Sequence, residues 1–429
     1  MKTLNYAVAP GRARARTRFR ALGITSGIGS MLASSAAAGF EIVGNVEWRN
    51  YYRAVTDAGD NTFLENFPGA VLANRLEHLT AGDHKNFHDV DLVMSHPECG
   101  AYSRLQVVNR DLNYTKSDIP LAMEMVNRFQ PKFFVLDEMP KSLLGVPISE
   151  WAAELPGYRL FPEWISNYHY GNSQRHRQRM FMIGARDDQD FVFVPGEQDL
   201  ELTLADALRD LPREAQANEL PYMGDKHRFG LSRHVLERDT EMTYRQMFKY
   251  VAKMPRGETL TYFDSNGDLR PRLGVRRMGW DHPAYVLTGG ANLFHPEGRL
   301  FTIRERARIQ GFPDSFVFHG LELEDDGTWL AERNGHMHRQ TGKAMPLQFT
   351  GYAARQIMAH LEGKPWKVKP KRVIAPHPLV SQAKLDYCKA VGYASGQQER
   401  ACQACWLQKE CTIRSSRAAP PEELDALLH

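Results

Sequence analysis

The chain has 429 residues, of which 42% are hydrophobic and 24% charged, so it can form two or three domains with at least one sizeable core. Lys and Arg exceed Asp and Glu by only 54 − 51 = 3, a net charge too small to indicate a nucleic-acid partner by itself. No apolar run is long enough to span a membrane, and no secretory leader follows the basic N-terminus. These features exclude a membrane-spanning class and predict a cytoplasmic protein.

Residues 1–20 form a basic arm in which arginine alternates with other residues, at Arg12, Arg14, Arg16, Arg18 and Arg20. A second alternating cluster lies at Arg175, Arg177 and Arg179. Clusters of this kind suit contacts with phosphates. A solvated basic face explains the arm equally well.

Short apolar segments alternate with helical segments between residues 21 and 184. This alternation predicts an α/β fold with a doubly wound sheet. The expected strands are Ala21–Thr25, Glu41–Glu47, Asp91–Met94, Phe133–Leu136 and Met180–Ile183. The expected helices are Ser30–Ala38, Asn50–Asn61 and Leu121–Phe129.

A glycine-containing turn follows the first expected strand and precedes a helix, with the residues Thr25, Ser26, Gly27, Ile28 and Gly29. Glycine lets the backbone turn tightly beneath a ligand close to a helix N-terminus. Glu47 ends the next strand, where a carboxylate can bind ribose hydroxyls. The turn therefore indicates a nucleotide-like ligand, although a glycine-rich turn without a ligand remains an alternative.

A single cysteine, Cys99, stands in the loop after the strand Asp91–Met94. Loops at the carboxyl ends of parallel strands are where such sheets bind ligands, and a thiolate there can attack an electrophilic carbon. Glu98 adds a negative charge beside the thiol, which should raise the thiol pKa unless an arginine offsets it. A lone cysteine in a loop usually has no catalytic role, so these features make Cys99 a candidate nucleophile, and the preference for it comes from the family resemblance given below.

Two adjacent acids, Asp137 and Glu138, lie at the end of the expected strand Phe133–Leu136. Neighbouring residues of a strand face opposite ways, so only one of the two acids is expected in a pocket on one side of the sheet. Arg177 and Arg179 immediately precede the strand Met180–Ile183, and an exposed basic strand entry is the alternative to a functional role.

The region from residue 187 to 279 is polar and irregular, as expected for an inserted specificity domain. The segment Phe301–Asp314, FTIRERARIQGFPD, then predicts an amphipathic helix that ends at a Gly-Phe-Pro-Asp turn. A last block, Arg339–Pro346, precedes another helix and contains Lys343 and Ala344.

The remaining four cysteines, Cys388, Cys402, Cys405 and Cys411, lie in a C-terminal extension after a basic linker. Their spacing predicts one shared metal centre, because the two closest cysteines are separated by only two residues. The spacing favours an iron–sulfur cluster, while zinc and unligated buried thiols remain alternatives. The extension has little core of its own, and such a centre would stabilise it.

The order of these blocks resembles the DNA cytosine-5 methyltransferase family. The string FTIRERARIQGFPD is similar to the family's ninth motif, which supports the target-reading domain. The family motifs Pro-Pro-Cys-Gln, Glu-Asn-Val, Gln-x-Arg-x-Arg and Gln-x-Gly-Asn-Ala-Val-Pro have looser counterparts around Cys99, Asp137, Arg177 and Lys343. The resemblance covers about residues 21–361. It implies a Rossmann-like fold that binds S-adenosylmethionine.

The resemblance also implies roles for single residues. Cys99 would attack C6 of a flipped cytosine, Asp137 or Glu138 would hold its N3 edge, and the first arginine, Arg177, would contact the base and the acid. Cofactor contacts would come from the glycine turn, Glu47, Trp48, Pro97, Lys343 and Ala344. The chain departs from the family at Thr25, Arg75, Glu98, Glu138 or Met139, and Lys343.

We therefore expect an S-adenosylmethionine-dependent DNA cytosine-5 methyltransferase that acts on double-stranded DNA as a monomer in a bacterial or phage setting. A related pyrimidine C5-modifying enzyme with an altered donor or group, and a non-catalytic DNA-binding relative, are the alternatives. The expected domains are a catalytic domain (21–186 and 330–362), a target-recognition domain (187–329), a linker (363–379) and the Cys-rich extension (380–429).

Overall fold

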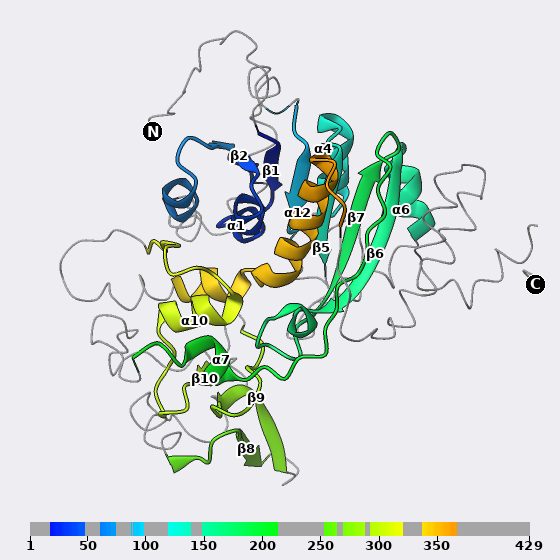
Figure 1. Cartoon of the computed structure of the whole chain (residues 1–429). Helices are drawn as coiled ribbons and strands as arrows, with labels where there is room; N and C mark the ends of the chain where they lie inside the picture. Colours follow the sequence, from blue (N-terminus) through cyan, green and yellow to red (C-terminus); the bar gives the residue numbers. More distant parts are fainter. Residues whose placement is uncertain are drawn as a thin grey trace, which may run out of the picture.

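The computed structural model of the chain describes residues 18–47, 61–73, 87, 89–97, 119–138, 148–212, 253–263, 269–287, 292–320 and 337–366. Within these residues, a large sheet with helices on both faces lies above a smaller sheet (Figure 1).

The large sheet has seven strands in the order β3-β2-β1-β4-β5-β7-β6. The first five of these run parallel to one another, and β7 runs antiparallel to both β5 and β6. The strands are β1 (Arg20–Ile24), β2 (Glu41–Val46), β3 (Val71–Ala73), β4 (Leu92–Ser95), β5 (Phe133–Glu138), β6 (Tyr158–Ser166) and β7 (Gln178–Arg186). The predicted α/β fold is confirmed.

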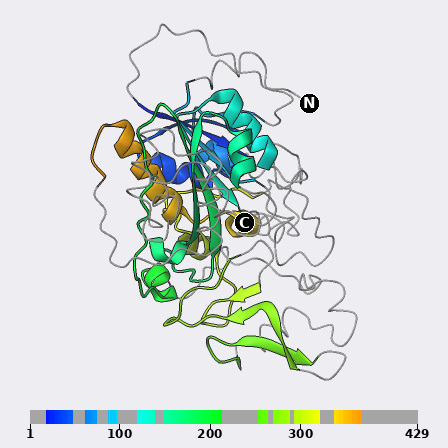
Figure 2. The same cartoon turned by 90° about the vertical axis from the view of Figure 1, so that its right-hand side faces the viewer.

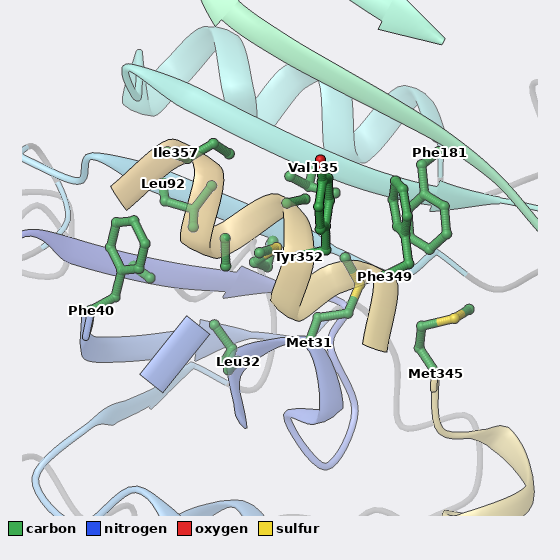
Figure 3. Close-up of a cluster of buried hydrophobic side chains, with 14 of the residues drawn as sticks. Met31, Leu32, Phe40, Leu92, Val135, Phe181, Met345, Phe349, Tyr352 and Ile357 are labelled. Atoms are coloured by element: carbon green, nitrogen blue, oxygen red, sulfur yellow. The ribbon is translucent and has the colours of Figure 1, made fainter. Parts of the chain in front are cut away.

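One face of the large sheet is covered by α1 (Ser30–Ala37) and α12 (Leu347–Leu361), which pack against each other. Their apolar side chains meet those of β4, β5 and β7 in the largest core cluster, shown in Figure 3. A hydrogen bond of 2.9 Å between the hydroxyls of Ser34 and Thr350 joins the two helices. The last described helix, α12, therefore packs beside the first helix, α1, on the same face of the large sheet.

The opposite face is covered by α4 (Ile119–Phe129) and α6 (Ile148–Glu154). Phe129 packs edge-on against Phe87, and Trp151 is almost completely buried. Because helices cover both faces of the sheet, the central strands bury side chains on both sides. This explains why the sequences of these strands are continuous apolar runs.

The smaller sheet has the order β10-β9-β8, with β8 (Thr259–Phe263), β9 (Leu269–Arg277) and β10 (Asn292–Phe294). Figure 2 shows it extending away from the large sheet. Between the sheets lie α7 (Leu204–Leu208) and α10 (Ile303–Gln310), whose apolar residues form a separate cluster. The predicted helix in Phe301–Asp314 is present. It begins after Thr302 and ends at Gly311, which has φ 88°.

Three features of the large sheet differ from expectation. The sequence pattern did not indicate β3, the strand at one edge of the sheet. The strand predicted at Met180–Ile183 extends over nine residues, and it pairs with a strand, β6, that the sequence pattern did not indicate. Of the predicted helix Asn50–Asn61, only its last residue lies in the described part of the chain. In that part, no helix is long and apolar enough to cross a membrane.

Candidate functional site

The candidate residues meet at one edge of the large sheet. The strand order reverses direction between β1 and β4, and open α/β sheets bind ligands in the crevice beyond the carboxyl ends of the strands at such a point. The glycine turn follows β1, His96 and Pro97 follow β4, and Asp137 lies near the end of β5. Because β7 is antiparallel to β5, Arg179 at its start reaches the same edge.

The glycine turn and the acid of the next strand are in direct contact. The backbone N–H of Gly27 donates to Oε1 of Glu47 at 2.6 Å, and the side chain of Asn45 donates to the same oxygen at 2.8 Å. Asn45 also donates to the Gly27 carbonyl. Glu47 therefore lies against the glycine turn, and Asn45, which the sequence reasoning missed, hydrogen-bonds to both.

The shape of the turn suits a bound nucleoside. Gly27 has φ 56°, and a Cβ placed there would have no atom of the described residues within 4 Å. Gly29 differs, because a Cβ there would lie 2.6 Å from the ring of Phe67. Gly29 thus allows close packing beneath the turn, while Gly27 leaves room above it. The open turn beside a carboxylate fits the adenosyl part of S-adenosylmethionine.

The last sequence block lies beside this turn. The Met345 N–H donates to the hydroxyl of Ser30, the first residue of α1, at 3.2 Å. Ala344 is buried and Lys343 is exposed. The chain therefore places the segment with Lys343 and Ala344 beside the start of α1, and the contact of these two residues with a cofactor stays a prediction.

We expect Glu47→Gln to weaken the binding of S-adenosylmethionine about 10- to 100-fold, because hydrogen bonds to a charged acceptor are worth about 1.5–3 kcal/mol. Glu41→Gln, at the exposed other end of β2, is the matched control and should bind normally. Calorimetric titration of both variants measures the difference. Equal affinities in the two variants would show that Glu47 does not hold the cofactor.

The acid at the end of β5 forms a buried ion pair. Asp137 is 0% exposed, and Nε of Arg179 donates to its Oδ1 at 2.8 Å while Nη2 donates to its Oδ2. Nε2 of His96 lies 3.3 Å from Oδ2. The structure thus combines an acid, an arginine and a histidine from three adjacent strands or their loops.

Burial and charge act on these groups in opposite ways. Burial raises the pKa of Asp137, and Arg179 opposes that rise through its charge and hydrogen bonds. Burial lowers the pKa of His96 well below its usual value, and the charges of Arg179, Arg177 and Lys343 lower it further. His96 is therefore neutral at neutral pH.

The two arginines near the start of β7, Arg177 and Arg179, have different hydrogen-bond partners. The sequence reasoning assigned the acid to the first arginine, Arg177, but Arg179 supplies the two-pronged contact with Asp137. Arg177 donates to the carbonyls of Leu287 and Ala344, at 2.6 and 2.8 Å. The difference follows from strand pairing, which places the start of β7 directly beside the end of β5.

The helix α10 is joined to the site through buried amides. Gln310 donates to the carbonyls of Thr341 and Ala344, and Gln174 donates to the Gln310 side chain at 2.8 Å. Gln174 also accepts from the Leu287 N–H. The helix α10 therefore fixes the positions of Gln174, which lies three residues before Arg177, and of the block Arg339–Pro346. These hydrogen bonds are structural and involve no reacting group.

Several predicted residues lie outside the described part of the chain. They are Cys99, Trp48 and the four cysteines of the extension, Cys388, Cys402, Cys405 and Cys411. The backbone of Glu138 is described, and its side chain is not. Among the described residues, no group of three or more His, Cys, Asp or Glu side chains could hold a metal. The choice between an iron–sulfur cluster and zinc stays a prediction.

His96 is a residue of the site that the sequence reasoning missed. It stands three positions before Cys99, and its partner Asp137 is 41 positions further along the chain. The only local signal is a histidine at the carboxyl end of a parallel strand. A single histidine in a loop is too common for that signal to stand alone.

A mostly parallel sheet with a glycine turn, a carboxylate beside that turn and a buried acid–arginine pair places the chain among the α/β folds that bind nucleotide-like cofactors at their switch point. Residues 19–359 match the family model of the C-5 cytosine-specific DNA methylases. The chain belongs to this family.

Curated relatives agree with this family. The chain is 26% identical over 317 residues to the type II methyltransferase M1.HphI of Haemophilus parahaemolyticus, covering 70% of this chain and 78% of that protein. It is 25% identical to M.NgoFVII of Neisseria gonorrhoeae, covering 79% and 86%. It is 29% identical to M.BbvI of Brevibacillus brevis, covering 46% of this chain and 54% of that one, so the chain spans about half the length of M.BbvI.

Solved structures show the same fold. A prophage-encoded protein of E. coli, described as a DNA modification methyltransferase, superposes with a TM-score of 0.54 at 21% identity, covering 80% of this chain and 99% of that chain. A mutant of Spodoptera frugiperda DNMT2 superposes with a TM-score of 0.50 at 12% identity, covering 79% and 99%.

Proposed function

We propose that the protein transfers a methyl group from S-adenosylmethionine to C5 of a cytosine flipped out of double-stranded DNA. The observation that carries the proposal is the buried pair of Asp137 and Arg179, at the edge shared by the glycine turn and the chain leading to Cys99. Base flipping brings C6 and C5 of the pyrimidine out of the stack to such an edge.

In this proposal each group at the edge has one task. The glycine turn and Glu47 hold the cofactor, which supplies an electrophilic methyl group when bound. The Cys99 thiolate attacks C6, and the thiol leaves again when C5 loses its proton. The positive charges of Arg177, Arg179 and Lys343 act on His96, three positions before Cys99, and cations near a thiol favour its thiolate, whereas the charge of Glu98 opposes it.

We expect Cys99→Ala to abolish methyl transfer, with a loss of at least about 1,000-fold, because no other group replaces the nucleophile. Incubation with unmethylated genomic DNA and labelled S-adenosylmethionine measures the transfer. Glu41→Gln, at the exposed start of β2, is the control and should keep the activity. Transfer that persists in Cys99→Ala would contradict the assignment of the nucleophile.

A second candidate keeps the nucleophile and changes the transferred group or its donor. Lys343 favours it, because the family usually has Asn at this position and the Lys343 charge reaches His96 at the reacting edge. Mass spectrometry of nucleosides from DNA of expressing cells identifies the product without assuming a cofactor. 5-Methylcytosine supports the first candidate, and another C5 adduct supports the second. DNA binding without a product would indicate a non-catalytic relative.

The C-terminal extension is proposed to bind an iron–sulfur cluster through its four cysteines, with zinc as the alternative. Elemental analysis and the visible absorbance of the purified protein separate the two metals. We further propose that the protein acts as a monomer on double-stranded DNA in the cytoplasm of a bacterial or phage-infected cell. This setting is supported by the bacterial source of the three relatives named above.

A further inference from the structure

The acid at this site is fully engaged by protein groups. Both oxygens of Asp137 accept from Arg179, and Oδ2 also faces Nε2 of His96 at 3.3 Å. The side chain is 0% exposed. Asp is one methylene shorter than the Glu of the family motif, so it reaches less far beyond the strand.

The side chain of His96 lies closer to solvent than that of Asp137. Its side chain is 15% exposed, against 0% for Asp137, so the imidazole forms the outer member of the pair. Its backbone N–H donates to the carbonyl of Ile24 at 3.3 Å, which holds it at the end of β1 beside the glycine turn.

The surroundings of His96 determine which nitrogen carries its proton. Arg179 on β7, Arg177 just before that strand and Lys343 in the last block are the cations that act on His96, and Asp137 on β5 is the anion. Burial and the three cations lower the pKa of His96 and leave the ring neutral. A neutral ring facing a carboxylate places its N–H on Nε2. Nδ1 then carries a lone pair, which can accept a hydrogen bond.

We propose that His96, rather than Asp137, reads the polar edge of the flipped base, with Nδ1 accepting a hydrogen bond from the exocyclic 4-amino group of cytosine. Uracil and thymine carry a carbonyl at that position, which also presents lone pairs and is rejected. Asp137 and Arg179 are positioning residues that fix the ring and its tautomer. This inference rests on the proposed function, because it requires a base in this pocket.

The test compares two substrates for each protein variant. Duplexes carry 5-fluoro-2′-deoxycytidine or 5-fluoro-2′-deoxyuridine at the target position, which sequencing of DNA from expressing cells locates. Covalent adducts formed with S-adenosylmethionine present are counted on denaturing gels. The wild-type protein should prefer the cytosine duplex. His96→Phe should lower that preference about 10- to 100-fold, the discrimination that one well-placed hydrogen-bonding contact to a base provides.

His96→Asn is the conservative variant, because its Oδ1 can take the place of Nδ1 as acceptor. It should keep most of the preference that His96→Phe loses. His96→Gln moves the acceptor outward by one bond and should lose preference. Comparison of the Asn and Gln variants decides the outcome if His96→Phe does not fold, which circular dichroism reveals.

The outcomes separate the two proposals. A wild-type protein that forms no adduct with either duplex overturns the proposed function and this inference with it. Adducts that form with the same cytosine preference in wild type and His96→Phe overturn the role of His96 alone. Equal preference in the Asn and Gln variants does the same where the Phe variant is unfolded.

Discussion

Replacing Arg179 by methionine is expected to destabilise the protein by about 3–5 kcal/mol and to abolish methyl transfer. Asp137 would remain at 0% exposure without the guanidinium that donates to both of its oxygens. Breaking a buried ion pair by removing one partner leaves an uncompensated charge, and this cost exceeds the net value of the pair itself. Urea unfolding followed by tryptophan fluorescence measures the loss of stability.

The same strand provides a matched control. Arg186 at the other end of β7 also forms a two-pronged pair, with Asp188, but the two side chains are 30% and 56% exposed. Asp188→Asn should therefore cost less than about 1 kcal/mol, because water screens exposed pairs. The double variant Arg179→Met, Asp137→Leu should regain stability without regaining activity. A stable Arg179→Met protein with wild-type activity would show that the Asp137–Arg179 pair is needed neither for stability nor for methyl transfer.

The sequence was sufficient for the strands with continuous apolar runs, because burial on both faces leaves a direct pattern. It was not sufficient for β6, whose residues Tyr158–Ser166 include Arg159, Pro162 and Glu163. Pro is tolerated on edge strands, and β6 is the edge of the sheet beyond β7. Charged residues and proline therefore made an edge strand look like a loop.

The acid of the site could be predicted only as a pair of candidates. Asp137 and Glu138 are adjacent, and nothing in the local pattern decides which one faces the arginines. The fold places Asp137 against Arg179 through the pairing of β5 with β7. His96 was missed for the same reason, because its role depends on the carboxylate of Asp137, which a neighbouring strand brings near it. Such long-range pairings are properties of the sheet and not of any sequence window.

Replacing Glu305 by alanine is expected to cost about 3 kcal/mol, although this residue is remote from the chemistry. Glu305 closes a capping box with Thr302 at the start of α10, accepting from the Thr302 N–H at 2.8 Å. It also accepts two hydrogen bonds from Arg299, and His295 lies 3.5 Å away. The value is at the lower end for breaking a buried ion pair, because Arg299 is 16% exposed.

The chain contains a second capping box that serves as control for Glu305. Thr203 and Asp206 close it at the start of α7, where Asp206 is 33% exposed and binds no buried arginine. Asp206→Ala should cost about 0.5–1 kcal/mol, the ordinary value of a cap. If both variants lose the same stability in urea unfolding, Glu305 acts as a cap alone. A larger loss of stability in Glu305→Ala means that α10 depends on the buried ion pair. The position of Gln174, which α10 holds through Gln310, then depends on that pair as well.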